Sequence, residues 1–296
     1  MRGSALLLAL GLLGACSHRA LANPAAEEAA VVHELVAVTD SLWRYTAGAY
    51  HGVLLVTDEG VVVTDPLSAE AATWLRSEVQ ARFDKPIAYV VYSHNHPDHA
   101  YGGQALDGPG TRFVAHALAD RDWRRTRADV RLPDLVFSED LTLHVGGQTI
   151  ELRHHGRNNG LGSVSMRFVE QGVLHVVDWV VVGRVPYADL PGYDINGMID
   201  STREVLALDF DTFVGGHADI GDRAGVERYL AYLEALHGQV LTGVLQGKDL
   251  PTLQDEVDLS AYADLAAYER WHRDNIAGVY RQLLDISYLD QRPAAD

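Results

Sequence analysis

The most constraining feature of the sequence is a dense group of imidazole and carboxylate side chains directly after an apolar run. Residues 87–92 (IAYVVY) suit a buried strand, and Ser93-His94-Asn95-His96-Pro97-Asp98-His99 follows them. Loops at strand ends hold reactive groups on a rigid scaffold. Imidazole and carboxylate are ligands that suit a borderline cation such as Zn²⁺. We therefore interpret this segment as a metal site rather than as a histidine-rich surface loop.

The acidic composition of the chain argues against several classes of partner. The 296 residues include 41 acidic and 24 basic ones, a formal net charge of −17, and no basic run interrupts this background. Binding to nucleic acid needs clustered Lys and Arg, and an anionic membrane surface attracts polybasic segments. We expect neither partner, and we expect a small-molecule substrate instead. The single cysteine excludes an intramolecular disulfide framework, a cysteine-rich zinc module and an iron–sulfur cluster.

The first residues have the pattern of a targeting segment. Arg2 precedes the apolar run 5–15, which is too short to span a bilayer but has the length of a signal-peptide core. Cys16 follows this run and resembles the lipidated cysteine of the bacterial lipobox, whereas cleavage after Ala22 is the alternative. We assign residues 1–22 to a signal segment and tether. The protein is expected to be exported, either to the periplasm or to the outer membrane through a lipid anchor on Cys16.

The rest of the chain contains strands and helices in two batches. Strands are predicted at residues 35–38, 42–45, 53–57, 61–64, 87–92, 148–154, 163–168 and 173–177. Helices are predicted at residues 71–83, 117–127, in the second half of 192–208, at 226–245 and at 262–284. This pattern predicts an α/β domain of two sheets with helices outside. We expect the domain to span residues 31–250, with residues 251–296 as a C-terminal helical extension packed on it.

The motif H-x-H-x-D-H after an apolar strand resembles the signature of the metallo-β-lactamase superfamily. Three further positions match that family's motifs in order: Asp65 closes an early strand, Asp178 follows an apolar strand, and His217 lies in a Gly-His turn. The resemblance covers roughly residues 35–236. It implies an αββα sandwich of two mixed β-sheets flanked by helices, to which the C-terminal helix is an addition.

One position departs from the family pattern. The family's third motif is a His followed by Thr, any residue, Gly and Ser or Asp, and the matching stretch here is Asn159-Gly160-Leu161-Gly162-Ser163. Asn159 therefore replaces the expected ligand. His154 and His155 lie just upstream and are alternative ligands if the loop is rearranged. Gly162-Ser163 supports the register that places Asn159 at the site.

The resemblance also implies how the ligands divide between two cations. The first site has an incomplete set: His94, His96, the shared Asp178 and at best the amide oxygen of Asn159. The second site has a complete set: Asp98, His99, His217 and the shared Asp178. An amide is neutral and a weaker ligand than imidazole, so we expect one tightly bound Zn²⁺ and a second that is weak or absent. Asp65 is expected to orient a ligand histidine through the other ring nitrogen.

The activity implied by this site is that of a zinc-dependent hydrolase. A zinc-bound hydroxide would attack an electrophilic carbon of an ester, a lactone, a thioester or a related small molecule. Asp98 and Asp178 are the candidate catalytic residues, which would hold the water and take its proton.

The stretch after Asp178 is expected to line the mouth of the pocket. Arg184 is a candidate for receiving a substrate carboxylate, and Tyr187 or Tyr193 for donating a hydrogen bond. A surface ion pair of Arg184 is an alternative of equal weight. Tyr268 and Trp271 of the last helix are expected to lie in the core rather than to form a substrate platform.

Two other functions are weighed against hydrolysis. An iron-dependent oxidoreductase, similar to the persulfide dioxygenases of the superfamily, would rely on the first site, which is the incomplete one. A non-catalytic metal- or ligand-binding protein on a degraded site is suggested by the same missing histidine. The retention of all four ligands of the second site argues against it.

Overall fold

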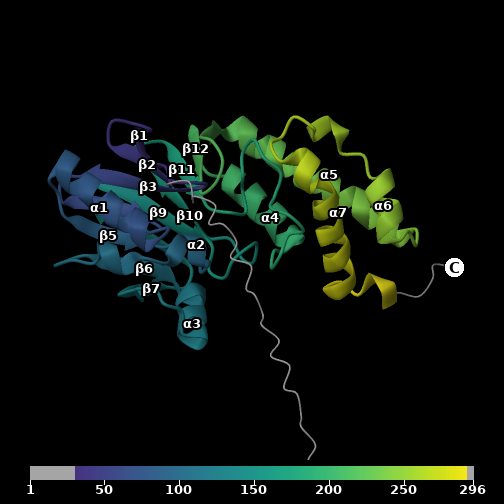
Figure 1. Cartoon of the computed structure of the whole chain (residues 1–296), viewed down its shortest axis with the longest axis horizontal. Helices are drawn as coiled ribbons and strands as arrows, with labels where there is room; N and C mark the ends of the chain where they lie inside the picture. The colour runs from purple at the N-terminus through teal and green to yellow at the C-terminus, as the bar shows by residue number, and fades with distance from the viewer. Residues whose placement is uncertain (1–30, 292–296) are drawn as a thin grey trace, which may run out of the picture. The chain divides into compact units, whose positions relative to one another are not determined.

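The computed structural model describes residues 31–291, so the expectations for Cys16 and Ala22 lie outside the described residues. Two mixed β-sheets face each other, and helices lie on their outer sides (Figure 1). This arrangement confirms the predicted αββα sandwich. Within the described range, no helix is both long enough and apolar enough to cross a bilayer.

The first sheet brings two functional loops to one edge. Its strands, in spatial order, are β1 (His33–Ala37), β2 (Leu42–Ala47), β3 (Tyr50–Thr57), β4 (Gly60–Thr64), β5 (Ile87–Val91), β6 (Arg112–His116) and β7 (Leu135–Phe137). Strands β4 and β5 run parallel, with Thr64 opposite Val91. Because the carboxyl ends of parallel strands meet at the same edge, Asp65 and the segment 93–99 emerge next to each other.

In the second sheet, two parallel strands likewise end next to each other and are followed by candidate site residues. Its strands, in spatial order, are β13 (Gly221–Asp222), β12 (Thr212–Gly215), β11 (Val173–Val176), β10 (Val164–Phe168), β9 (Gln148–His154) and β8 (Asp140–Val145). Strands β11 and β12 run parallel, with Val176 opposite Gly215. Asp178 and His217 each follow two residues after these paired positions, so they also leave the sheet at one edge.

A layer of apolar side chains holds the two sheets together. Leu55 and Val62 from the first sheet and Leu152 and Met166 from the second belong to one buried cluster. All four are essentially inaccessible to solvent. Burying a side chain of this size contributes about 1.5–3 kcal/mol. The packing of this layer sets the position of one sheet's edge relative to the other.

Short helices cover the first sheet. They are α1 (Ala69–Phe83), α2 (Pro97–Ala100) and α3 (Ala117–Thr126), with a 3₁₀ turn at Gly103–Leu106. The side chain of Ser68 caps α1 by accepting a hydrogen bond from the backbone N–H of Ala71. Leu75 and Val79 on one face of α1 pack in the cluster beneath it. The helix predicted at residues 71–83 is therefore observed, and it begins two residues earlier.

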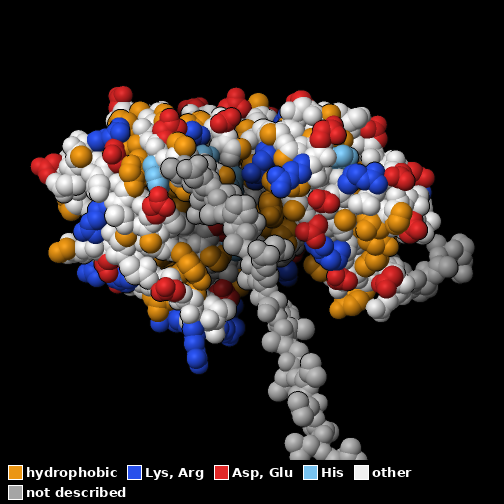
Figure 2. Space-filling model, viewed as in Figure 1, with side chains coloured by type: hydrophobic (Ala, Val, Ile, Leu, Met, Phe, Trp, Pro, Cys, Tyr) orange, Lys and Arg blue, Asp and Glu red, His pale blue; other side chains and the backbone are white. Residues whose placement is uncertain are grey.

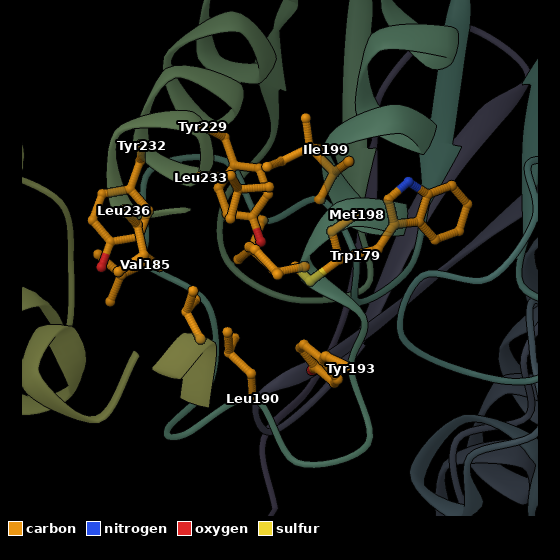
Figure 3. Packing of buried hydrophobic residues seen from close by; sticks show 14 of the residues in the cluster. Trp179, Val185, Leu190, Tyr193, Met198, Ile199, Tyr229, Tyr232, Leu233 and Leu236 are labelled. Atoms are coloured by element: carbon orange, nitrogen blue, oxygen red, sulfur yellow. The ribbon is translucent and has the colours of Figure 1, made fainter. Parts of the chain in front are cut away.

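The helices of the later part of the chain are α4 (Ile195–Leu206), α5 (Arg223–Leu245), α6 (Leu250–Glu256) and α7 (Tyr268–Asp285), with 3₁₀ turns at Ser260–Tyr262 and Leu289–Gln291. Helix α5 contacts strands β12 and β13 of the second sheet, α4 and α7 pack on α5, and α6 packs on α7. Figure 3 shows Tyr229 and Leu233 of α5 packed with Met198 and Ile199 of α4. Segment 179–193, which links β11 to α4, contributes further side chains to the same cluster. The pocket residues predicted after Asp178 therefore lie on a segment that is anchored in a core.

The structure corrects the prediction for the C-terminal region. The helix expected at residues 262–284 begins only at Tyr268, after Ala267 in a left-handed conformation. Helix α6 was not predicted, although Asp249 caps it and Pro251 lies in its first turn. These two residues are a start signal for a helix. The short length of α6 left too few apolar positions for a recognisable period.

Charged side chains of both signs are interspersed on the face seen in Figure 2. Ion pairs include Arg203 with Glu234 at 2.8 Å and Arg273 with Asp255 at 3.0 Å, all on exposed side chains. Exposed pairs of this kind contribute about 1 kcal/mol or less each. The stability of the fold therefore comes mainly from its three apolar clusters.

Candidate metal centre

The carboxylate of Asp178 lies between two pairs of imidazole rings. Its Oδ2 is 3.0 Å from His94 Nε2 and 3.1 Å from His96 Nδ1. Its Oδ1 is 3.4 Å from His99 Nε2 and 2.9 Å from His217 Nε2. Asp178 itself is only 5% exposed. One carboxylate with a pair of imidazoles at each oxygen has the geometry of a ligand shared by two cation sites.

Two groups of donor atoms surround this carboxylate. One consists of His94, His96 and Asp178, and the other of Asp98, His99 and His217; within each group the donor atoms lie within 4.8 Å of one another. Within residues 31–291, His94 Nε2 and Asp178 Oδ1 are buried and make no hydrogen bond of acceptable geometry, despite their short distances to the neighbouring charges. Nitrogen and oxygen donors left without partners fit a divalent cation such as Zn²⁺.

Local backbone geometry brings these donors together. His96 is the N-cap of the short helix α2, and Pro97 occupies its first turn. A Cβ on Gly216 would lie 2.5 Å from Val177 Cγ1 and 3.1 Å from His99 Cε1, so only glycine fits directly before His217. Asp178 has a φ of 71°, a left-handed conformation that residues other than glycine seldom adopt. Such strained positions occur frequently at functional sites.

Polar partners hold the far side of three rings. Asp65 Oδ2 lies 3.4 Å from His99 Nδ1 and accepts a hydrogen bond from Ser93 Oγ at 2.6 Å. Ser93 Oγ is in turn 2.8 Å from His94 Nδ1. The carbonyl oxygen of Ala49 lies 3.0 Å from Nδ1 of His217. These contacts fix the ring orientations, and Asp65 occupies the place expected of a residue that orients a ligand histidine.

The buried charges of the centre stabilise one another. Burial alone raises the pKa of Asp178, but the neighbouring His94 and His99 hold it well below its ordinary range. Burial alone lowers the pKa of His99, whereas the carboxylates of Asp178 and Asp65 raise it to about 10. Asp178 is therefore ionised at neutral pH and available as a ligand. A cation that binds here must displace the proton of His99, so metal binding releases protons.

Asn159 lies at the centre, whereas the two alternative histidines do not. Its Nδ2 donates a hydrogen bond to Asp178 Oδ2 at 2.9 Å. His154 stacks on His116 with the ring centroids 4.1 Å apart, and His155 contacts Glu204 and Ser165 instead. Neither belongs to a donor group of the described residues. The structure thus places Asn159 beside Asp178, with its amide N–H toward that carboxylate.

Contacts of His155 form a second polar chain away from the metal centre. His155 Nδ1 lies 2.8 Å from Glu204 Oε2, and its Nε2 lies 2.7 Å from Ser165 Oγ. This order of Glu, His and Ser is that of a hydrolytic triad. Ser165 is only 1% exposed, so a substrate cannot reach its hydroxyl. We interpret the chain as a structural link between β10 and α4.

A cavity of about 400 Å³ opens over the centre. Four of its lining residues, His96, Asp98, Asp178 and His217, form what we call the metal-ligand wall. Four others, Arg184, Tyr187, Tyr193 and Trp271, form what we call the aromatic wall. The three pocket residues predicted after Asp178 therefore all line the cavity. Its volume suits a small organic molecule.

Two aromatic residues of the cavity were not predicted. Tyr50 packs edge-on against His217, with ring centroids 5.3 Å apart, and no motif signals it because it lies at the start of strand β3. Trp271 was expected in the core but lines the cavity. Tyr268, one helical turn earlier, is 8% exposed and does lie in the core. Helical spacing alone does not show which apolar residue of α7 meets a cavity.

Comparison with known proteins identifies the family. A family model described as the metallo-beta-lactamase superfamily matches residues 45–217, more than half of the 296-residue chain. The 2,4-dinitroanisole O-demethylase subunit alpha of Nocardioides sp. (strain JS1661) is 27% identical over 222 residues, which are 74% of this chain and 67% of that protein. A metallo-beta-lactamase from Pontibacter korlensis superposes with a TM-score of 0.62 at 20% identity, over 69% of this chain and 99% of that one. This likeness shows the same fold. Because the family model matches more than half of its residues, the chain belongs to the metallo-beta-lactamase superfamily.

Proposed function

We propose that the protein is an exported zinc-dependent hydrolase that cleaves an ester, a lactone, a thioester or a related bond of a small molecule. The observation that carries the proposal is the position of Asp178 between four imidazole nitrogens at 2.9–3.4 Å, beneath a cavity of about 400 Å³. Membership of the superfamily supports a metal-dependent reaction.

The residues of the site have separate roles in binding the metal, moving a proton and binding the substrate. A bound divalent cation supplies Lewis acidity and lowers the pKa of a water molecule at the site. With the cation bound, Asp98 and Asp178 would accept hydrogen bonds from that water, and one of them would receive its proton. Burial raises the pKa of Tyr193, so its phenol stays protonated and can donate a hydrogen bond to a substrate oxygen. Ser93 and Asp65 keep the ligand rings in place.

We further propose that one zinc binds tightly and a second binds weakly. The second site offers Asp98, His99, His217 and the shared Asp178. The first site offers His94, His96 and Asp178, and the amide N–H of Asn159 already contacts that carboxylate. An N–H group cannot ligate a cation. Unequal affinity of the two sites follows from this difference.

Metal analysis and a substrate panel test this function. Protein purified with limited zinc should contain about one zinc per chain, and a chelator should abolish hydrolysis that added zinc restores. The panel should include esters, lactones, thioesters and β-lactams. It should also include 2,4-dinitroanisole, because a relative is named for demethylating it. Zinc-loaded protein that cleaves none of them would contradict the proposal. Bound iron with oxygen uptake on a persulfide would favour the oxidoreductase instead.

Export is tested separately on the full-length chain. In a bacterial host fed a labelled fatty acid, the protein should incorporate the label and sediment with membranes. The substitution Cys16→Ser should abolish labelling and leave the protein soluble in the periplasm or uncleaved. Unlabelled wild-type protein in the periplasm would indicate cleavage after Ala22, and wild-type protein in the cytoplasm would contradict export.

A further inference from the structure

Arg184 lies in the cavity without an acidic partner. No ion pair of residues 31–291 includes it, although acidic residues outnumber basic ones by 41 to 24 in the chain. Its Nε is buried and has no hydrogen-bond partner among those residues. The surface ion pair that was the alternative for Arg184 is therefore not formed. A buried guanidinium N–H without a partner costs free energy unless a ligand completes it.

The backbone around Arg184 is held on both sides. Arg184 forms a parallel β-bridge with Ala266, just before helix α7. Val185 N–H donates to the Ala266 carbonyl at 3.2 Å, and Ala266 N–H donates to the Gly183 carbonyl at 2.9 Å. The backbone from which this side chain projects is thus fixed before any ligand arrives. Pre-organisation of this kind distinguishes a binding residue from a solvated surface arginine.

An aromatic surface adjoins the guanidinium. Arg184 Cζ lies 5.4 Å from the centre of the Trp271 ring, and the Tyr187 ring meets Trp271 edge-on at 5.1 Å. All three residues line the same cavity as the metal ligands. A guanidinium group binds an anionic group, and neighbouring aromatic rings offer apolar contact to a planar body.

We propose that the aromatic wall selects an aromatic carboxylate: Arg184 binds the carboxylate, and Trp271 and Tyr187 pack against the ring. The inference rests on the proposed function for its reaction, but the recognition itself is a property of these side chains. It assigns substrate selection to helix α7, which lies outside the matched residues 45–217. The electrophilic carbon of the substrate would then lie in the same cavity as Asp98 and Asp178.

Calorimetric binding of unreactive probes tests this recognition independently of hydrolysis. Benzoate is the main probe; benzamide lacks its charge, and cyclohexanecarboxylate lacks its planar ring. With zinc-loaded protein, benzoate should bind more tightly than either. Arg184→Gln should weaken benzoate binding about tenfold or more, as expected for a charge-assisted hydrogen bond, and leave benzamide unchanged. Trp271→Leu should weaken benzoate and benzamide, but not cyclohexanecarboxylate.

Arg270 provides a matched control. Its Cζ lies 5.1 Å from the same Trp271 ring, but Arg270 does not line the cavity. Arg270→Gln removes the same charge near the same ring and should leave benzoate binding unchanged. Arg184→Lys, which keeps a positive charge, should retain part of the affinity if Arg184→Gln proves unstable. Thermal unfolding of each variant shows whether it is folded.

The outcomes separate the inference from the proposed function. Loss of affinity in Arg184→Gln, both with zinc and after chelation, supports the inference even if no panel substrate is cleaved. Equal affinity of wild type and Arg184→Gln for benzoate would overturn it, because the cation alone would then hold the carboxylate. Absence of benzoate binding at millimolar concentration would also overturn it. If either of these results were obtained, cleavage of neutral aliphatic esters would still support the proposed hydrolase function.

Discussion

The two walls of the cavity are built differently. Most of the metal-ligand wall follows the ends of buried parallel strands, and three of the metal-binding rings have polar partners behind them. The aromatic wall comes from the segment after β11 and from helix α7, which are joined by a single β-bridge and side-chain contacts. This difference indicates that the chemistry and the selection of the substrate can be changed separately.

The aromatic wall depends on helix α7 for its position. The Asn275 side chain of α7 donates hydrogen bonds to the carbonyl oxygens of Pro186 at 3.1 Å and Ala188 at 2.6 Å, and accepts one from Tyr232 Oη at 2.6 Å. A Cβ on Gly278 would collide with the carbonyl oxygen of Asp189. Close packing of loop on helix thus replaces the sheet hydrogen bonds that position the metal-ligand wall.

Removal of the shared carboxylate should have the largest effect. Asp178→Ala removes the carboxylate that contacts the rings of both sites, so zinc binding and hydrolysis should both be lost. Asp98→Ala should abolish tight binding as well, because it removes a donor from the complete site. Trp271→Leu, in the aromatic wall, serves as the control and should keep its zinc. Elemental analysis of the three variants, together with thermal unfolding, decides the outcome.

A histidine at the third motif should reduce the difference in zinc affinity between the two sites of the metal-ligand wall. Asn159→His replaces an amide beside Asp178 by an imidazole, so zinc content should rise from about one towards two per chain. Zinc titration followed by calorimetry measures both sites. The matched control is Asn158→His, one residue earlier, whose side chain contacts Ser201 rather than Asp178. Unchanged stoichiometry in Asn159→His would show that the third-motif register is wrong or that both sites are already filled.

Loosening the aromatic wall should leave the metals in place. Asn275→Ala leaves two carbonyl oxygens and one phenol without their partner, so the free energy of unfolding should fall by about 2–4 kcal/mol. Benzoate binding should weaken while zinc content stays constant. Urea denaturation, calorimetry and elemental analysis measure these effects. Asn196→Ala, at an exposed position of α4, is the control. A loss of zinc in Asn275→Ala would mean that the two walls are not separable.

The smallest expected effect concerns acid stability outside both walls. Burial lowers the pKa of His154 from 6.5 to about 4, so the unfolded chain binds a proton there more readily than the folded one. The contribution of neutral His154 to the free energy of unfolding is fully present above pH 6.5 and is lost as the pH falls towards 4. His154→Gln should therefore flatten the decrease of stability measured by urea denaturation across that range. The exposed His144→Gln should not, and an equal effect in both variants would refute the assignment.

Secondary structure was predictable where the local pattern was strong. The strands β3, β4, β5 and β9 to β11 and the helices α1, α3, α4 and α5 lie close to their predicted positions. Strands β6 and β7 were not predicted, and β7 has only three residues. Strand β8 was also missed, although Leu141, Leu143 and Val145 alternate with polar residues in the manner of a strand. Neighbouring strands supply the hydrogen bonds of such short segments, and a local pattern does not contain them.

By itself, the sequence indicated the family and a set of candidate metal-binding side chains, because ligands crowded after one buried strand leave few alternatives. It also located Asn159 through the glycine and serine that follow it. The tertiary structure supplied the geometry around Asp178, since residues 94–99, 178 and 217 meet where the edges of two separate sheets come together. The tertiary structure alone also placed Tyr50 and Trp271 at the cavity. The physical reason is that an apolar face is encoded locally, whereas the neighbour that covers it, or the cavity that leaves it open, depends on the packing of distant segments.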